Sequence, residues 1–213
     1  YTFKLKKNVT FSDGKPLTAK DVVFTMKAVK NPLLIDGASL RNYYESLVDI
    51  ATPDDYTVIM TLNKPYFIAD AVLGNNVAIF PKHVFDPKGL TDKYTFAETN
   101  SLEKAQENAA MKEFAEWFGA AERKRDVNTM IGSGPYILEE WRTGESIRLK
   151  RNDKYWNGSN NPNATAYPDK LVFKTVNDRN TALTTMKNGA IDFIEYMPPK
   201  LYVESLDTAS IPF

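Results

Sequence analysis

The chain has a single histidine, His83, and no cysteine, so any histidine-centred catalytic site would have to use this one residue. A Ser-His-Asp site also needs a nucleophile and a carboxylate that converge on the imidazole. His83 lies in the stretch FPKHVF, beside Pro81 and without such a partner nearby in the sequence. The sequence therefore predicts a structural role for His83 and a protein that is not an enzyme.

Metal and nucleotide chemistry have equally little support. Zinc sites are built mainly from Cys and His ligands, and this chain offers one histidine and scattered carboxylates. The glycine-punctuated stretch GSGPY, residues 132–136, has neither the G-x-G-x-x-G nor the G-x-x-x-x-G-K-[ST] spacing. It leads into an expected strand, which favours a tight crossing or hinge over a phosphate-binding loop. We expect no metal and no cofactor.

Two carboxylates near the N-terminus, Asp13 and Asp21, could be read as a pair for acid-base work. Local structure explains each of them. Asp13 begins an Asp-Gly turn dipeptide, in which Gly14 accepts a positive φ. Thr18 is a favourable N-cap, and Asp21 is placed to reach back to the cap amide and to meet the positive end of the helix dipole. The stretch FSDGKPLTAKDVVFTMK is therefore interpreted as a turn-and-cap unit that joins a strand to a helix.

Helices and strands are expected to alternate along the chain without a repeating period, which indicates a mixed α/β fold. A strand is expected over residues 1–11 and a helix from Ala19 to about Asn31. Further helices are expected at the start of 39–50 and over 67–74, 100–125 and 179–189. Further strands are expected at the end of 39–50, over 55–62, from residue 77 until Pro81 stops it, and over 136–141, 145–152, 171–176 and 190–197. Asn100 and Glu103 could cap the helix over 100–125, and residues 155–170 read as a long polar loop. A domain boundary is expected near residues 131–135.

Composition excludes several classes of protein. The 213 residues contain 27 basic and 27 acidic side chains, so the formal net charge is zero and favours neither nucleic acid nor anionic membranes as a partner. No apolar run approaches the roughly 20 residues that a membrane-spanning helix needs. The 43% hydrophobic content suits a globular chain with a buried core. The chain opens on Tyr1 within an expected strand, so we expect any export signal to lie outside it.

The stretch YTFKLKKNVTFSDGKPLTAKDVVFTMK resembles the signature of the family 5 extracellular solute-binding proteins, the oligopeptide-, dipeptide- and nickel-binding receptors of ABC importers. The matching residues are Phe11, Asp13, Gly14, Pro16, Leu17, Thr18, Ala19, Asp21, Val22 and Phe24. Further matches follow in the family's order: DYTVIMTLNKPY, IFPKHVF, GSGPYIL, LKRNDKYW, LVFKTV and NGAIDF. Together these segments span nearly the whole chain.

The resemblance implies a mixed-sheet, periplasmic-binding-protein-like α/β fold (type II, cluster C), present only in part. Residues 1–130 would form the small family-specific α/β domain without its N-terminal strands, and residues 131–213 the central segment of the first lobe. The second lobe would be absent from this chain. The helical stretch 100–125 looks longer than in many members of the family, and its purpose is not indicated by the sequence.

The resemblance also implies a function and a site. We expect an exported receptor, periplasmic or a cell-surface lipoprotein and monomeric, that encloses a peptide or similar small solute between two lobes and delivers it to the transmembrane subunits of an ABC permease. Glu195, Tyr196 and Met197 match positions near the ligand backbone, and Tyr44 best matches an aromatic contact from the small domain. The alternative for each of these residues is a role in ordinary packing. The sequence does not distinguish peptide, nickel chelate, sugar and opine as the solute.

Two other functions stay open at this point. The same fold is sometimes used as the ligand-sensing domain of a transcriptional regulator, which a helix-turn-helix upstream in the gene would favour. A hydrolase would have to depend on His83, for which the sequence offers no histidine-centred constellation. Because the charged groups that pair with a peptide's ends come mostly from the later lobe in peptide-binding relatives, we expect this chain alone to bind ligand feebly or not at all.

Overall fold

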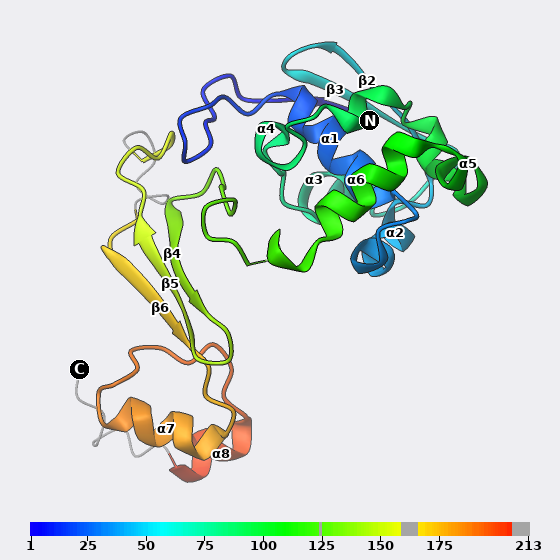
Figure 1. Ribbon diagram of the computed structural model, residues 1–213. Coiled ribbons are helices and arrows are strands. Elements are labelled where there is room, and N and C mark those ends of the chain that lie inside the picture. The colour runs from blue at the N-terminus through cyan, green and yellow to red at the C-terminus, as the bar shows by residue number, and fades with distance from the viewer. Residues whose placement is uncertain (124, 159–165, 206–213) are drawn as a thin grey trace. The chain divides into compact units, whose positions relative to one another are not determined.

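The computed structural model describes residues 1–123, 125–158 and 166–205, without the side chains of Tyr202, Glu204 and Ser205. These residues fall into two compact units (Figure 1). The first unit comprises Tyr1–Glu139 and Leu149–Leu171, and the second comprises Glu140–Arg148 and the chain from Val172 onwards. The boundary near residue 130 that the resemblance implied stays a prediction.

Near its N-terminus, the first unit contains the turn and helix cap that the sequence predicted. Strand β1 is short, Thr2–Lys4, and the predicted strand over 1–11 is wrong beyond it, because the chain there makes only an isolated bridge between Thr10 and Pro16. Gly14 has a φ of 85°, as the Asp-Gly turn requires. Helix α1, Ala19–Lys30, starts at Thr18, whose amide and hydroxyl both donate to the Asp21 carboxylate. The predicted capping is confirmed.

A three-stranded antiparallel sheet in the order β1-β3-β2 packs against α1. Strands β2, Leu47–Asp54, and β3, Thr57–Leu62, correspond to the strands predicted at the end of 39–50 and over 55–62, and they pair as an antiparallel hairpin. The chain reaches β2 through three short helical turns: η1, Ile35–Gly37; α2, Ala38–Arg41; and η2, Asn42–Tyr44. An antiparallel sheet can bury one of its two faces, and in this sheet the side chains of one face are buried under α1.

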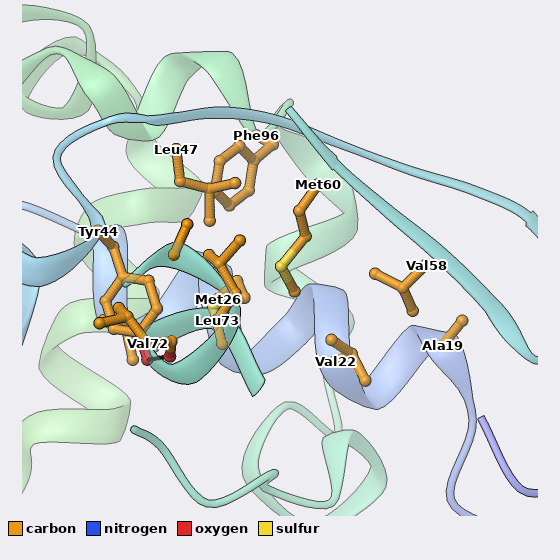
Figure 2. Close-up of a cluster of buried hydrophobic side chains, with 12 residues drawn as sticks. Ala19, Val22, Met26, Tyr44, Leu47, Val58, Met60, Val72, Leu73 and Phe96 are labelled. Atoms are coloured by element: carbon orange, nitrogen blue, oxygen red, sulfur yellow. Dashed lines mark hydrogen bonds between the residues drawn. The ribbon is translucent and has the colours of Figure 1, made fainter. Parts of the chain in front are cut away.

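The main core of the first unit lies between α1 and this sheet (Figure 2). Val22 of α1 and Met60 of β3 point toward one another in the close-up, and both are almost fully buried. Helix α3, Ala69–Asn75, adds Val72 and Leu73 to the same cluster. The remaining members share this burial: Ala19, Met26, Val29, Tyr44, Leu47, Val58, Ala69 and Phe96.

A second cluster, rich in phenylalanine, lies on another side of α1. Phe24 of α1 meets Phe114 edge to face, with ring centroids 5.8 Å apart. Phe80 and Phe85 pack against Phe118 in the same cluster. The strand predicted from residue 77 to Pro81 is wrong, because residues 77–80 form no strand. After Pro81, Lys82–Phe85 form the short helix α4, whose first amide, that of Lys82, donates to Asp21.

The single helix predicted over 100–125 is wrong in detail. After the turns η3, Leu90–Lys93, and η4, Ala97–Asn100, the chain forms two helices, α5, Leu102–Glu107, and α6, Ala109–Gly119, and then the turn η5, Ala121–Arg123. Asn108 separates the helices, because its side-chain oxygen accepts the Ala110 and Met111 amides and caps a new helix. Ser101, not Asn100, caps α5.

Three strands predicted downstream are confirmed: β4, Tyr136–Arg142; β5, Ser146–Arg151; and β6, Lys170–Lys174. They form a sheet in the order β4-β5-β6, and the chain passes from one unit to the other within each of these strands. Of the predicted polar loop over 155–170, residues 159–165 lie outside the described residues.

The described residues of the second unit form two helices, α7, Arg179–Lys187, and α8, Pro199–Ser205. Helix α7 is the predicted one, and Gly189 ends it with a φ of 69°. The strand predicted over 190–197 is wrong: residues 191–197 are irregular, and among the described residues no backbone hydrogen bond joins them to another strand. Apolar alternation alone does not make a strand where no neighbour accepts its hydrogen bonds.

Candidate functional site

The candidate ligand-facing segment is the irregular stretch Glu195–Met197, between α7 and α8. Glu195 is exposed, Tyr196 is 61% exposed and Met197 is half-buried. Gly189 closes the preceding helix, and the Pro198-Pro199 pair begins the next one, so the local sequence itself keeps this stretch out of both helices. The three residues predicted from the resemblance therefore lie together on the surface of the second unit.

Tyr196 is held by Arg179, the first residue of α7. Nη1 of Arg179 donates to the Tyr196 carbonyl at 3.0 Å. The guanidinium carbon of Arg179 also lies 5.5 Å from the centroid of the Tyr196 ring, within the range of a cation–π contact. One side chain thus fixes both the backbone and the ring of the same residue. Sequence reasoning missed Arg179, because nothing at residue 179 indicates a contact with residue 196.

The start of α7 is in turn fixed by its cap. Asp178 accepts hydrogen bonds from the amide and the hydroxyl of Thr181, each at 2.8 Å. These hydrogen bonds, that from the amide first, lower the pKa of the Asp178 carboxyl. Ala182 and Leu183 are buried and anchor the helix beneath. Arg179 therefore projects from a well-defined helix end.

Tyr44 lies in the other unit and in a different environment. It is 1% exposed, its hydroxyl donates to the Val72 carbonyl at 3.1 Å, and its carbonyl accepts from Nζ of Lys30 at 2.9 Å. Burial raises the pKa of its phenol. Its neighbour Tyr43 is 51% exposed. The structure thus places Tyr44 within the packed core, with no ring surface presented to solvent.

His83 has a partner that sequence spacing could not reveal. Its Nε2 lies 2.6 Å from the carboxylate of Asp13, seventy residues away in the sequence, and its ring packs edge to face against Phe11. Partial burial acts to raise the pKa of Asp13, but the hydrogen bonds from His83 and the Lys15 amide outweigh it and lower that pKa. Among the described residues, the hydrogen bonds of His83 include no serine or threonine hydroxyl, so the pair does not extend into a nucleophilic triad there.

The part of the chain that the structure describes contains no group of three or more His, Asp or Glu side chains that could hold a metal ion. The paired glutamates Glu139 and Glu140 of β4 contact different cations, Lys170 for the first and Arg142 and Arg148 for the second.

Comparison with known proteins identifies the family. Residues 1–211 match the family described as bacterial extracellular solute-binding proteins, family 5 Middle. The oligopeptide-binding protein AppA of Bacillus subtilis (strain 168) is 33% identical over 198 residues, which cover 91% of this chain and 29% of AppA. The dipeptide-binding protein DppE of the same organism is 26% identical over 226 residues, covering 99% of this chain and 34% of DppE. The chain thus spans about a third of the length of these curated relatives.

Solved structures agree. The structure of AppA from Bacillus subtilis in complex with a nonapeptide matches with a TM-score of 0.60 at 30% identity, over 90% of this chain and 31% of that one. A periplasmic oligopeptide-binding protein of Thermotoga maritima matches with a TM-score of 0.66 at 25% identity, over 95% of this chain and 32% of that one. The predicted type II periplasmic-binding-protein fold, present in part, is confirmed. The chain belongs to the family 5 bacterial extracellular solute-binding proteins.

Proposed function

We propose that this chain is part of the solute-binding receptor of an ABC importer, which captures a peptide or similar small solute between two lobes and delivers it to a membrane permease. The observation that carries the proposal is the family match over residues 1–211. Relatives described as oligopeptide- and dipeptide-binding favour a peptide-like solute. A structural relative at 26% identity, AgaA, is described in complex with agropinic acid, so the solute class is set by contacts and not by the fold.

The proposed mechanism is closure of two lobes around the solute, without covalent chemistry. We assign Glu195, Tyr196 and Met197 to one side of the cleft, which their exposed or half-buried positions support. The buried ring of Tyr44 favours a packing role over the ligand contact that the resemblance implied. Because the chain spans about a third of its relatives, we propose that residues outside it complete the cleft.

The comparisons give no support to the alternative of a ligand-sensing domain of a regulator, since the family and the relatives described above are solute-binding proteins. In the described residues no helix is both long enough and apolar enough to cross a membrane. We propose export to the periplasm or the cell surface as a lipoprotein, with the permease subunits as partner and the receptor acting as a monomer. Light scattering of the purified receptor measures the last point, and a dimer would overturn it.

Isothermal titration calorimetry tests the function. Di- to nonapeptides are titrated into the 213-residue chain and into the full-length polypeptide of its reading frame. We expect a dissociation constant of about 1 μM or tighter for at least one peptide with the full-length polypeptide, and binding weaker by about a hundredfold or more with the 213-residue chain. Tight binding by the 213-residue chain would contradict the incomplete cleft, and no binding by the full-length polypeptide would contradict a peptide solute.

A matched pair of substitutions locates the site. In the full-length polypeptide, Tyr196→Ala is expected to weaken peptide binding about tenfold, because it removes an exposed aromatic surface from the cleft. Val203→Ala, which truncates another exposed apolar side chain of the second unit, is the control and is expected to leave the affinity unchanged. Equal effects of the two substitutions would remove the assignment of residues 195–197.

A further inference from the structure

The stretch that carries the candidate contacts has little of its own to hold it in place. Among the described residues, no backbone–backbone hydrogen bond is made by residues 191–197. Phe193 is 75% exposed, Tyr196 is 61% exposed, and Ile191, Ile194 and Met197 are only half-buried, so no fully buried side chain fixes the stretch either. A loop with neither ladder hydrogen bonds nor a buried anchor samples many conformations unless side chains from elsewhere hold it.

Two cations from neighbouring elements supply such contacts. Nζ of Lys174, at the end of β6, donates to the Ala190 carbonyl at 3.0 Å, where the stretch begins. Arg179 contacts its far end, through the 3.0 Å hydrogen bond to the Tyr196 carbonyl and the 5.5 Å approach to the Tyr196 ring. Of these two cations, Arg179 is the one that contacts a residue proposed to line the cleft, Tyr196.

The chemistry of Arg179 suits this task better than that of a lysine. A planar guanidinium can place one N–H on a carbonyl oxygen and lay its face over an aromatic ring at the same time, which a tetrahedral ammonium on a flexible stem cannot do with equal definition. The base of the side chain is fixed because Asp178 caps α7 through Thr181. A rigid helix end is thus linked to the exposed ring by one oriented group.

We propose that Arg179 is a positioning residue of the binding site: it orients Tyr196, and with it the neighbouring Glu195 and Met197, toward the solute. The link between Arg179 and the solute rests on the proposed function, whereas the orientation of Tyr196 by Arg179 is independent of it. Arg179 acts through Tyr196 and is not itself assigned a contact with the solute.

The orientation is measured by fluorine NMR. 3-Fluorotyrosine is placed at position 196 of the 213-residue chain, and its resonance is recorded with Arg179, with Arg179→Lys and with Arg179→Ala. Arg179→Ala is expected to move the resonance toward that of fluorotyrosine in the urea-unfolded chain, and Arg179→Lys to give an intermediate position as the conservative variant. The matched control is Arg148→Ala, which removes another exposed arginine of the second unit, one that pairs with Glu140 instead. Its resonance is expected to coincide with that of the unsubstituted chain.

Coincident resonances for Arg179 and Arg179→Ala would overturn the positioning role, and so would an Arg148→Ala shift as large as that of Arg179→Ala, because the effect would then be general to the unit. If Arg179→Ala does not fold, Arg179→Lys decides, since it keeps the charge and the helix start. An unmoved resonance in Arg179→Lys would then overturn the role of the planar group.

The link to the solute is measured separately, by calorimetry on the full-length polypeptide with the di- to nonapeptide set. Arg179→Ala is expected to weaken peptide binding about two- to fivefold, the range of an exposed cation–π contact converted to affinity. An affinity unchanged within twofold would overturn that link while leaving the NMR result to stand. Absence of peptide binding by the unsubstituted full-length polypeptide would overturn the proposed peptide function and this link together, and the NMR comparison would still decide the positioning role.

Discussion

The two units of the chain differ in how much of their own apolar surface they bury. Among the described residues, all three hydrophobic clusters lie in the first unit. Of the second unit's described residues, the buried hydrophobic ones are Ala182 and Leu183, while Val172, Phe173, Phe193, Tyr196 and Val203 are exposed. In the part of the chain that the structure describes, the first unit has the core of an independent domain and the second has not.

The difference fits a receptor whose binding surface is completed by more chain. The second unit carries the proposed contacts Glu195–Met197, and it is also the part whose apolar side chains lack cover. Large apolar side chains left exposed in one part of a chain are candidates for contact with further protein or with a ligand. We therefore expect the first unit to fold stably in this chain and the second to be held only loosely.

The largest expected effect sets the two units against one another. Phe114→Ala removes a fully buried ring from the phenylalanine cluster of the first unit and is expected to lower the free energy of unfolding by about 3–5 kcal/mol. Phe173→Ala removes a ring that is 56% exposed in the second unit and is expected to change it by less than about 1 kcal/mol. Urea unfolding measures the two changes in unfolding free energy, provided that the dependence of this free energy on urea concentration is the same for each variant. Similar losses for the two substitutions would break the comparison.

The next effect concerns the polar link that joins α1 to α4. The buried Asp21 carboxylate accepts from the Thr18 amide and hydroxyl and from the Lys82 amide. Asp21→Asn replaces one acceptor oxygen by a donor and is expected to cost about 1–3 kcal/mol of unfolding free energy, because a buried donor loses its partner. The control is Asp70→Asn, in the exposed first turn of α3, with an expected loss below about 0.5 kcal/mol. Equal thermal shifts for the two variants would contradict the link.

Some of this architecture could be predicted from the sequence and some could not. The cap of α1 by Thr18 and Asp21, the β2–β3 hairpin and the end of α7 at Gly189 are all encoded within a few residues. The helix α4 could not be predicted in this way, because its first amide is held by Asp21, sixty-one residues away in sequence. Asn108 is a residue type that often caps helices, but the sequence alone does not show that the helix breaks there. The break depends on the packing of α5 against α6.

The candidate site divides along the same line. The position of Glu195–Met197 was predicted by resemblance, but its irregular backbone was not, since a strand exists only where a neighbour pairs with it. The sequence also could not separate the buried Tyr44 from the exposed Tyr43, because adjacent aromatic residues carry the same pattern. Long-range pairs such as Arg179 with Tyr196 and His83 with Asp13 depend on the fold as a whole.

A smaller effect distinguishes two buried tyrosines of the first unit. The Tyr94 hydroxyl is buried without a hydrogen-bond partner among the described residues, whereas the Tyr44 hydroxyl bonds to Val72. Tyr94→Phe is expected to leave the free energy of unfolding unchanged or to raise it by up to about 1 kcal/mol, and Tyr44→Phe to lower it by about 1 kcal/mol. Chemical denaturation of both variants checks this, and a clear loss in Tyr94→Phe would contradict it.

The same tyrosine gives a pH dependence. Burial, together with nearby carboxylates, raises the pKa of the Tyr94 phenol above its unfolded value near 10. Its contribution to stability is therefore fully present below pH about 10 and is lost as pH rises from there toward the folded pKa, because the unfolded state releases its proton first. Alkaline unfolding of Tyr94→Phe should be shallower than that of the unsubstituted chain. Identical curves would contradict the shift.

The smallest effect is expected at the surface pair of Asp13 and His83. Because the pKa of Asp13 is lowered in the fold, its contribution is present above the unfolded value near 3.9 and is lost as pH falls through the folded value. Asp13→Asn is expected to cost about 0.5–1 kcal/mol of unfolding free energy near pH 7 and nothing at pH values below both pKa values. A difference that does not change with pH would show that the charge has no part in it.

The central claim, that the first unit is self-sufficient and the second needs further chain, is tested most directly by hydrogen exchange with mass spectrometry. The 213-residue chain and the full-length polypeptide of its reading frame are compared peptide by peptide. We expect α1 and β3 to be equally protected in both, and β6, α7 and residues 191–197 to gain protection only in the full-length polypeptide. Protection of β6 and α7 in the 213-residue chain as strong as that of α1 would contradict the account.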